Sequence, residues 1–202
     1  MFDYYVFDLD GVLVDVRDSY KREVFDEVGD ELGREFDEDE IRRLWYGVGG
    51  DRKEIIRSWG YEPREFWEVF DALDTPERRV EHTFAYEDAR VVRELDAPKG
   101  LVTHSPPALA HPALEKAGLA DEFDSVVCCS YELGYKPEPA PIRACLDEMG
   151  ASPDETVMIG DSVSDVKGAW NAGLTAGHID RVGHRVEADI NIENLDAVRE
   201  FA

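Results

Sequence analysis

The chain has 202 residues, with an apolar fraction of 43% and an aromatic fraction of 10%; these values are ordinary for a globular protein and argue against disorder. Its formal net charge is −24, from 46 Asp and Glu against 22 Lys and Arg, which excludes the basic stripe that nucleic-acid binding requires. Such an acidic surface is typical of halophilic proteins, because concentrated ions screen the self-repulsion.

The three cysteines do not form a disulfide framework and suit a reducing compartment. Cys128 and Cys129 end an apolar stretch, so we expect them in the core at the end of a strand, with a reactive thiol as the weaker alternative. The chain shows no leader-like segment and no apolar run of about 18 residues. We therefore expect a cytoplasmic protein without a membrane partner.

The first predicted element is a buried strand at residues 4–7, because this run is continuously apolar and shows no alternation. Asp8 and Asp10 follow it and share one face of an extended chain, and Gly11 marks a sharp turn. Ligands of open α/β sheets bind at the carboxyl ends of the strands, and two acids this close require a cation or a proton between them. The pattern indicates a ligand site, with a polar loop as the open alternative.

Residues 15–86 are predicted to form an all-helical block without a strand. Apolar residues recur at spacings of three and four from Tyr20 to Leu32, and four more amphipathic segments follow, at residues 38–46, 52–59, 63–73 and 76–84. The glycine-rich run at residues 47–51 cannot continue a helix. We expect the turn at residues 49–53 to be either a substrate loop or a flexible solvent loop.

From residue 87 onward, helical and strand patterns alternate. Helices are expected at residues 87–95, 108–117, 142–149 and after 165; strands are expected at 100–102, 125–129, 156–159 and 174–178, before a last strand and helix within 188–201. This alternation predicts a doubly wound parallel sheet. The expected fold is an α/β core of residues 1–14 and 87–202, with residues 15–86 inserted as a small helical domain.

Polar side chains follow the predicted strands of this core. They are Asp8 and Asp10, Thr103, Lys136, Asp161 and Asp165. If the strands are neighbours, these groups converge on one crevice. Clustered carboxylates without zinc-type ligands favour a hard octahedral cation, so we infer Mg²⁺. A bound phosphoryl group best explains a cation held by acids with a lysine and a threonine opposite.

Four short motifs stand in chain order: D-L-D-G-V-L-V-D at residues 8–15, L-V-T at 101–103, K-P at 136–137 and G-D-S-V-S-D at 160–165. In this order, they resemble the motifs of the haloacid dehalogenase (HAD) superfamily, in the phosphoglycolate-phosphatase-like branch whose helical cap follows the first motif. The resemblance covers essentially the whole chain. It implies a Rossmann-like core, a helical cap and hydrolase activity on phosphate esters.

The resemblance also implies chemical roles. Asp8 would be the nucleophile that forms an aspartyl-phosphate, and Asp10 would protonate the leaving alcohol and then activate water. Thr103 and Lys136 would hold the phosphoryl oxygens, assisted by the backbone N–H near Leu9. A surface position is the structural alternative for Lys136.

The implied Mg²⁺ ligands are Asp8, the main-chain carbonyl of Asp10, and Asp161, with Asp165 as a ligand or an outer partner. Ser162 would either contribute to this site or cap the helix that begins there.

Other polar residues are less informative. His104 stands where the family often has Asn or Gly, and it either touches the substrate or is a structural loop histidine. Four acids outside the motifs are expected to be solvated or helix-end charges: Asp15, Asp18, Glu87 and Asp88.

Asp10 argues against dehalogenation, because a halide leaving group needs no proton. The leading interpretation is a Mg²⁺-dependent phosphomonoesterase that acts on a small phosphorylated metabolite, as a monomer or homodimer. A sugar phosphomutase of the β-phosphoglucomutase type is the close alternative. A non-catalytic phosphate-ester-binding module on the same fold is the third, because fold does not fix function.

Overall fold

The computed structural model describes residues 1–201. The chain divides into two compact units, one formed by Met1–Asp15 with the residues from Phe84 onward and the other by Val16–Thr83. Within the described residues, no helix has both the length and the apolar character that a membrane span needs.

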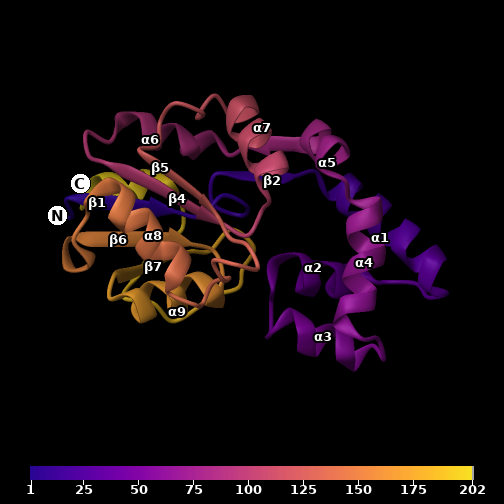
Figure 1. The fold of residues 1–202 in the computed structure, drawn as a ribbon. Helices are drawn as coiled ribbons and strands as arrows, with labels where there is room; N and C mark the ends of the chain where they lie inside the picture. Colours follow the sequence, from indigo (N-terminus) through magenta and orange to yellow (C-terminus); the bar gives the residue numbers. More distant parts are fainter. Residues whose placement is uncertain (202) are drawn as a thin grey trace. The chain divides into compact units, whose positions relative to one another are not determined.

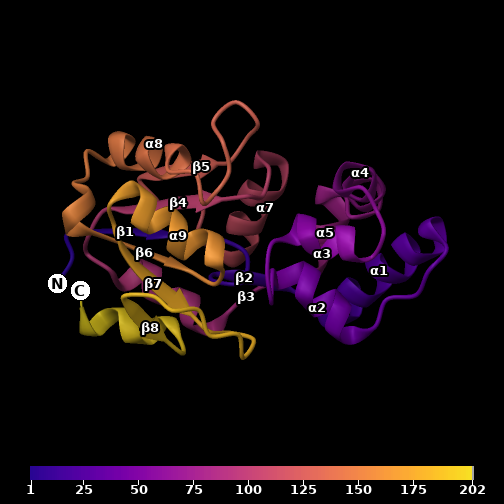
Figure 2. The same cartoon turned by 90° about the horizontal axis from the view of Figure 1, so that it is seen from below.

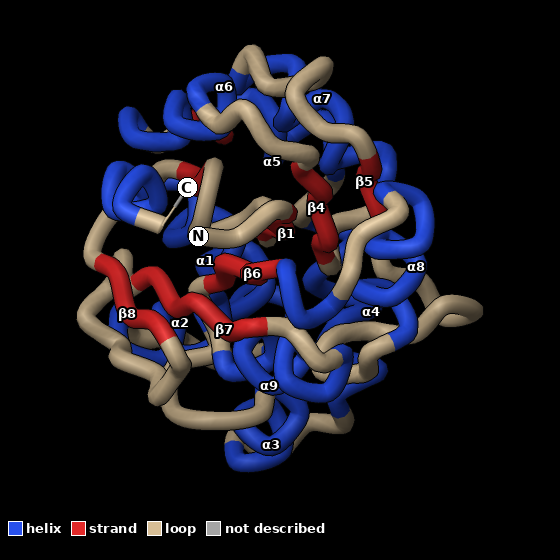
Figure 3. Tube along the Cα trace, turned by 90° about the vertical axis from the view of Figure 1, so that its left-hand side faces the viewer, coloured by secondary structure: helices blue, strands red, loops and turns tan. Residues whose placement is uncertain are grey.

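The first unit is built on a six-stranded parallel sheet, which confirms the predicted α/β fold. Its strands are β1 (Tyr4–Phe7), β4 (Lys99–Thr103), β5 (Ser125–Cys128), β6 (Thr156–Gly160), β7 (Thr175–Ile179) and β8 (Ile190–Ile192). Their order across the sheet is β5-β4-β1-β6-β7-β8 (Figure 3). The central strand β1 pairs with β4 and β6, so that Val6 lies opposite both Gly100 and Met158. The carboxyl ends of β1, β4 and β6 therefore lie side by side.

Helices cover both faces of this sheet (Figure 1). One face packs against α6 (Val91–Glu94), α7 (Pro107–Ala117) and the 3₁₀ helices η1 (Glu87–Arg90) and η3 (Leu195–Glu200). The other face packs against α8 (Ala140–Met149) and α9 (Val163–Ala172). A third 3₁₀ helix, η2 (Pro153–Glu155), precedes β6. Along β1, Tyr5 and Phe7 belong to the apolar core on the side of α6 and α7, and Val6 belongs to the core on the side of α8 and α9. Both faces of the strand are buried, which explains its unbroken apolar sequence.

The end of the chain differs from the expected α-helix, because residues Leu195–Glu200 form a 3₁₀ helix. Leu195 and Val198 are both fully buried there. Residues three apart eclipse one another in a 3₁₀ helix, so this conformation buries the pair on one side in a short segment.

The second unit contains α1 (Asp18–Leu32), α2 (Glu38–Tyr46), α3 (Arg52–Ser58), α4 (Pro63–Leu73) and α5 (Pro76–His82) (Figure 2). Its core is aromatic: Phe25 packs edge-on against Phe36 and Phe70, at centroid distances of 5.2 and 5.6 Å. Such pairs stabilise beyond the area they bury.

Two short strands correct the prediction that residues 15–86 contain no strand. β2 (Val14–Val16) and β3 (Thr83–Ala85) form a separate two-stranded sheet, and α5 ends at His82 rather than at residue 84. The sequences V-D-V and T-F-A are rich in β-branched and aromatic residues, which favour strands.

The glycine-rich turn before α3 is held by its own side chains. Asp51 caps α3 by accepting the N–H of Lys53, at 2.6 Å. The Arg52 guanidinium donates to the carbonyls of Leu44 and Trp45, at 2.9 and 2.8 Å. Arg52 thus satisfies carbonyls at the end of α2, and this favours a structural role for its side chain.

Candidate active site

Asp8 lies directly after the central strand. Its Oδ1 accepts the N–H of Leu9 and forms an ion pair with Nζ of Lys136, and both distances are 2.8 Å. The N–H of Leu9, which was expected to face a phosphoryl oxygen, is thus directed at the Asp8 carboxylate. The chain then turns tightly, with the N–H of Leu13 donating to the Leu9 carbonyl at 2.9 Å. This turn presents the Asp8 side chain at the carboxyl edge of the sheet.

Lys136, in the loop between β5 and α8, is the positive charge of the site. Its Nζ lies 2.8 Å from Oδ1 of Asp8 and 2.7 Å from Oδ1 of Asp165, and it donates to the Val102 carbonyl at 2.8 Å. Only 4% of the residue is exposed. The alternative that Lys136 is a surface charge is therefore wrong.

Two further carboxylates follow β6: Asp161 comes from the loop after the strand and Asp165 from the first turn of α9. One oxygen each of Asp8, Asp161 and Asp165 lies within 4.8 Å of the others. Asp161 lies directly over Gly11, because a Cβ at that position would come within 2.0 Å of Asp161 Oδ2. Gly11 also has a φ of +77°, which a side chain disfavours. Gly11 is therefore needed both for the turn and for the approach of Asp161.

Ser162 caps α9, as one of its two expected roles predicted. Its hydroxyl accepts the N–H of Asp165, and the Asp165 carboxylate accepts the N–H of Ser162 in return. This capping box fixes Asp165 on the first turn of the helix.

The electrostatics of the site show a shortage of positive charge. Burial raises the pKa of Asp8 to about 7, and nearby Asp165 adds to this although Lys136 opposes it. Burial also works against ionisation of Asp165, but the Lys136 ammonium and the Ser162 hydrogen bond outweigh it and keep the pKa of that carboxyl below its usual value. One ammonium among three clustered carboxylates leaves room for a further cation. An all-oxygen donor set fits a hard divalent ion such as Mg²⁺.

The carboxylate of Asp10 lies outside this group of three. Its Oδ2 accepts a hydrogen bond from the Ser105 hydroxyl at 2.5 Å. Thr103, at the end of β4, is fully buried, and its Oγ1 accepts the N–H of Ser105 at 3.0 Å. Sequence reasoning missed Ser105, although a hydroxyl two residues after Thr103 was a visible signal.

His104 packs edge-on against Tyr135, with ring centroids 5.7 Å apart. Tyr135 belongs to the same loop as Lys136. This contact supports the structural alternative for the histidine, in which it braces the loop that carries the lysine.

A second group of charges supports the turn after Asp10. It corrects the expectation for Asp15, which lies in β2 and is not solvated; Asp88 stands in the first turn of η1, as the helix-end expectation predicted, but it is buried. Both are only 7% exposed. Arg181 binds both carboxylate oxygens of Asp88 at 2.8 Å and also donates to the Val12 carbonyl at 2.8 Å. Tyr86 donates to Asp15 at 2.9 Å. Because Arg181 is distant in sequence, nothing local indicated this network. Asp18 and Glu87 are exposed at helix starts, as expected.

Cys128 and Cys129 lie at the end of β5, as predicted. Cys129 is buried, whereas Cys128, the last residue of the strand, is half-buried. Burial raises the pKa of both thiols, so both stay protonated at neutral pH. The reactive-thiol alternative is not supported.

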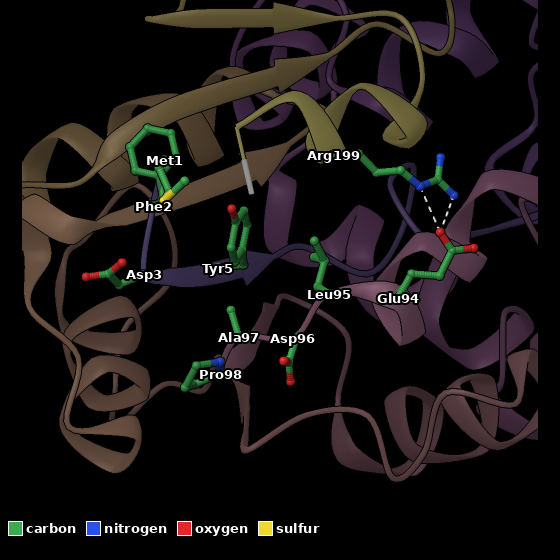
Figure 4. Close-up of a pocket in the computed structure, with 10 residues that line it drawn as sticks. All are labelled: Met1, Phe2, Asp3, Tyr5, Glu94, Leu95, Asp96, Ala97, Pro98 and Arg199. Carbon is green, nitrogen blue, oxygen red and sulfur yellow. Dashed lines mark hydrogen bonds and ion pairs between the residues drawn. The ribbon is translucent and has the colours of Figure 1, made fainter.

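A cavity of about 560 Å³ lies elsewhere in the first unit (Figure 4). It is lined by Tyr5, near the amino end of β1, and by Leu95, and the ion pair of Arg199 with Glu94 lies at its side. Asp8 follows the opposite end of the same strand. The cavity is therefore separate from the carboxylate cluster.

The sequence and the fold have counterparts in known proteins. The chain is 26% identical to the pyrophosphatase PpaX of Bacillus velezensis over 181 residues, which cover 85% of this chain and 81% of that one. It is 43% identical to a phosphoglycolate phosphatase of Rhodospirillum rubrum over 75 residues, covering 37% of this chain and 31% of that protein. With a phosphoglycolate phosphatase of Chromobacterium violaceum, the match spans 47% of the relative's length.

Among solved structures, a HAD phosphatase from Thermococcus onnurineus is similar with a TM-score of 0.71 and 29% identity, over 98% of this chain and 97% of that one. The family model for haloacid dehalogenase-like hydrolases matches residues 2–173. This match covers β1, the whole insertion and the strands through β6 with α9. The chain therefore belongs to the haloacid dehalogenase-like hydrolase family.

Proposed function

We propose that this protein is a Mg²⁺-dependent phosphomonoesterase that acts on a small phosphorylated metabolite through an aspartyl-phosphate on Asp8. The observation that carries the proposal is the pairing of Asp8 with Lys136 at 2.8 Å, next to Asp161 and Asp165, at the carboxyl edge of the sheet. A buried carboxylate with an ammonium beside it and further carboxylates around it suits attack on a phosphoryl group.

Each residue would have a distinct task. The ionised Asp8 attacks phosphorus, and Asp10 protonates the departing alcohol and later accepts a proton from the attacking water. Lys136 holds Asp8 in place and offsets the negative charge that accumulates on the phosphoryl oxygens, and the Thr103 hydroxyl donates to one of them.

Asp8, Asp161 and Asp165, with the main-chain carbonyl of Asp10, would hold the Mg²⁺. When bound, the ion supplies charge neutralisation among the carboxylates and polarises the phosphoryl group. The helical unit would serve as the cap domain, as expected for residues 15–86, and would select the substrate.

The names of the relatives suggest the first substrates to test, namely phosphoglycolate and pyrophosphate. We propose a phosphate monoester of a small metabolite as the substrate class, because Asp10 is available to protonate an alkoxide leaving group. Pyrophosphate would need this proton less.

The proposal predicts metal-dependent phosphate release. The purified protein should hydrolyse 4-nitrophenyl phosphate and phosphoglycolate with Mg²⁺, and lose this activity in a chelator, because without the ion the clustered carboxylates repel an anionic substrate. Re-addition of Mg²⁺ should restore it. Absence of phosphate release from both substrates by folded, Mg²⁺-loaded protein would contradict the proposal.

The surface charge predicts salt activation. With a net charge of −24, the protein repels phosphorylated anions and itself at low ionic strength, and added salt screens both effects. We expect kcat/KM to rise from about 0.1 M salt into the molar range. Circular dichroism at each concentration separates activation from refolding, and a flat profile for protein that stays folded would contradict this expectation.

A further inference from the structure

The side chain of Asp10 has a defined partner in the structure, Ser105. The Ser105 hydroxyl donates to Oδ2 of Asp10 at 2.5 Å, and Ser105 is only 5% exposed. Asp10 lies just beyond the end of β1 and Ser105 just beyond the end of β4, two strands that pair in parallel with Phe7 opposite Leu101. The contact thus joins two neighbouring strand ends.

Ser105 is itself held rigidly. Its N–H donates to Oγ1 of the fully buried Thr103 at 3.0 Å, and the Thr103 carbonyl accepts the N–H of Cys129 at 2.8 Å. Pro106 follows as the N-cap of α7 and Pro107 is the first residue of that helix, so the backbone after Ser105 has little conformational freedom. The hydroxyl is therefore a donor on a fixed support.

A fixed donor to Oδ2 sets the plane of the Asp10 carboxylate and hence the direction of Oδ1. Hydrogen bonds from a buried hydroxyl to a carboxylate are short and strong. Proton transfer to a leaving group requires the acid to lie within hydrogen-bond distance in a defined direction. Without the Ser105 hydroxyl, the carboxylate could rotate away from that direction.

We propose that Ser105 is a positioning residue, which holds the carboxylate of Asp10 in the orientation for proton transfer. This inference rests on the proposed function. The Ser105 proton stays on its oxygen, so no covalent step is assigned to it; its effect passes entirely through Asp10.

The test compares two substrates of similar shape but different need for an acid, phenyl phosphate and 4-nitrophenyl phosphate. The value of kcat/KM reports the steps up to the first irreversible transfer, and nitrophenolate leaves without a proton. For Ser105→Ala we expect kcat/KM to fall about tenfold to hundredfold with phenyl phosphate and less than about threefold with 4-nitrophenyl phosphate.

Three more variants complete the experiment. Ser105→Cys keeps the side-chain size but is a weak donor, so it should show the same selective loss even if the alanine variant folds poorly. Ser105→Thr keeps the hydroxyl and should recover most of the activity. Ser125→Ala is the matched control, because Ser125 is a buried serine whose hydroxyl donates to Glu148, and it should behave as the parent.

The outcomes separate the two proposals. An equal loss on both substrates, or none, in folded Ser105→Ala and Ser105→Cys proteins would overturn the positioning role while phosphatase activity of the parent stands. A parent that releases no phosphate from either substrate would overturn the proposed function, and the inference about Ser105 with it.

Discussion

Replacement of Asp8 by Asn should abolish phosphate release, lowering kcat by about 10⁴-fold or more, because the amide cannot attack phosphorus. The substitution keeps the size of the side chain and its place beside Lys136. Asp154→Asn, which removes an exposed acid, is the matched control and should retain parental activity. Steady-state phosphate release with Mg²⁺ measures both variants.

The Asp8→Asn variant should not be less stable than the parent, and the direction of this effect follows from the pKa of Asp8. Burial raises that pKa to about 7 in the metal-free protein, so the folded state binds a proton that the unfolded state releases near pH 4. Stability is therefore lost as pH rises from about 4 to about 7, and the full cost of ionising Asp8 is present above pH 7; an uncharged Asn removes that cost. In metal-free buffer at pH 8, Asp8→Asn should melt at or above the temperature of the parent. Activity near that of the parent in a well-folded Asp8→Asn protein would contradict the nucleophilic role.

Replacement of Lys136 by Met should reduce both activity and stability. The methionine has a similar length, but it leaves the buried carboxylates of Asp8 and Asp165 without their ammonium, which lies 2.8 and 2.7 Å from them. Removing one partner of a buried ion pair costs about 3–5 kcal/mol, or roughly 6–20 °C in melting temperature for a chain of this size. Loss of the charge that faces the phosphoryl oxygens should lower kcat about 10²- to 10³-fold.

A second substitution separates the two effects. The double variant Lys136→Met with Asp165→Asn removes one of the two buried carboxylates that have lost the ammonium. It should therefore recover part of the stability but none of the activity. The exposed Lys167 on the first unit provides the control Lys167→Met, which should match the parent in both respects. Thermal melting in metal-free buffer measures stability. A Lys136→Met protein as stable as the parent would contradict the expectation that the ammonium stabilises the buried carboxylates of Asp8 and Asp165.

The stability deficit of Lys136→Met should depend on pH. Without the ammonium, the pKa of both buried carboxyls rises, so the folded variant holds protons that the folded parent has released. The deficit therefore shrinks on acidification: at pH above about 7 for Asp8, whose pKa in the parent is about 7, and at lower pH for Asp165, whose pKa in the parent lies below its usual value.

The sequence alone was sufficient for the parallel sheet and for the approximate position of each strand. A strand buried on both faces must be apolar throughout, as Tyr4–Phe7 is, and parallel neighbours require crossover helices with their own periodicity. It was less informative at short elements such as β2, β3 and η3. Segments of three to six residues contain too little periodicity to distinguish a strand or a 3₁₀ turn from the end of an α-helix.

The order of the motifs indicated which side chains carry the chemistry. The local pattern places Asp8, Thr103 and Asp161 at strand ends and Lys136 in the loop after a strand. Only the tertiary structure decided which groups contact one another. The bond from Ser105 to Asp10 and the pair of Arg181 with Asp88 join residues 95 and 93 positions apart. Such contacts depend on which strands are neighbours in the sheet, and no local propensity encodes them. Burial depends on the same packing. Asp15 and Asp88 are buried, where they bind Tyr86 and Arg181, although their sequence context resembles a solvated surface.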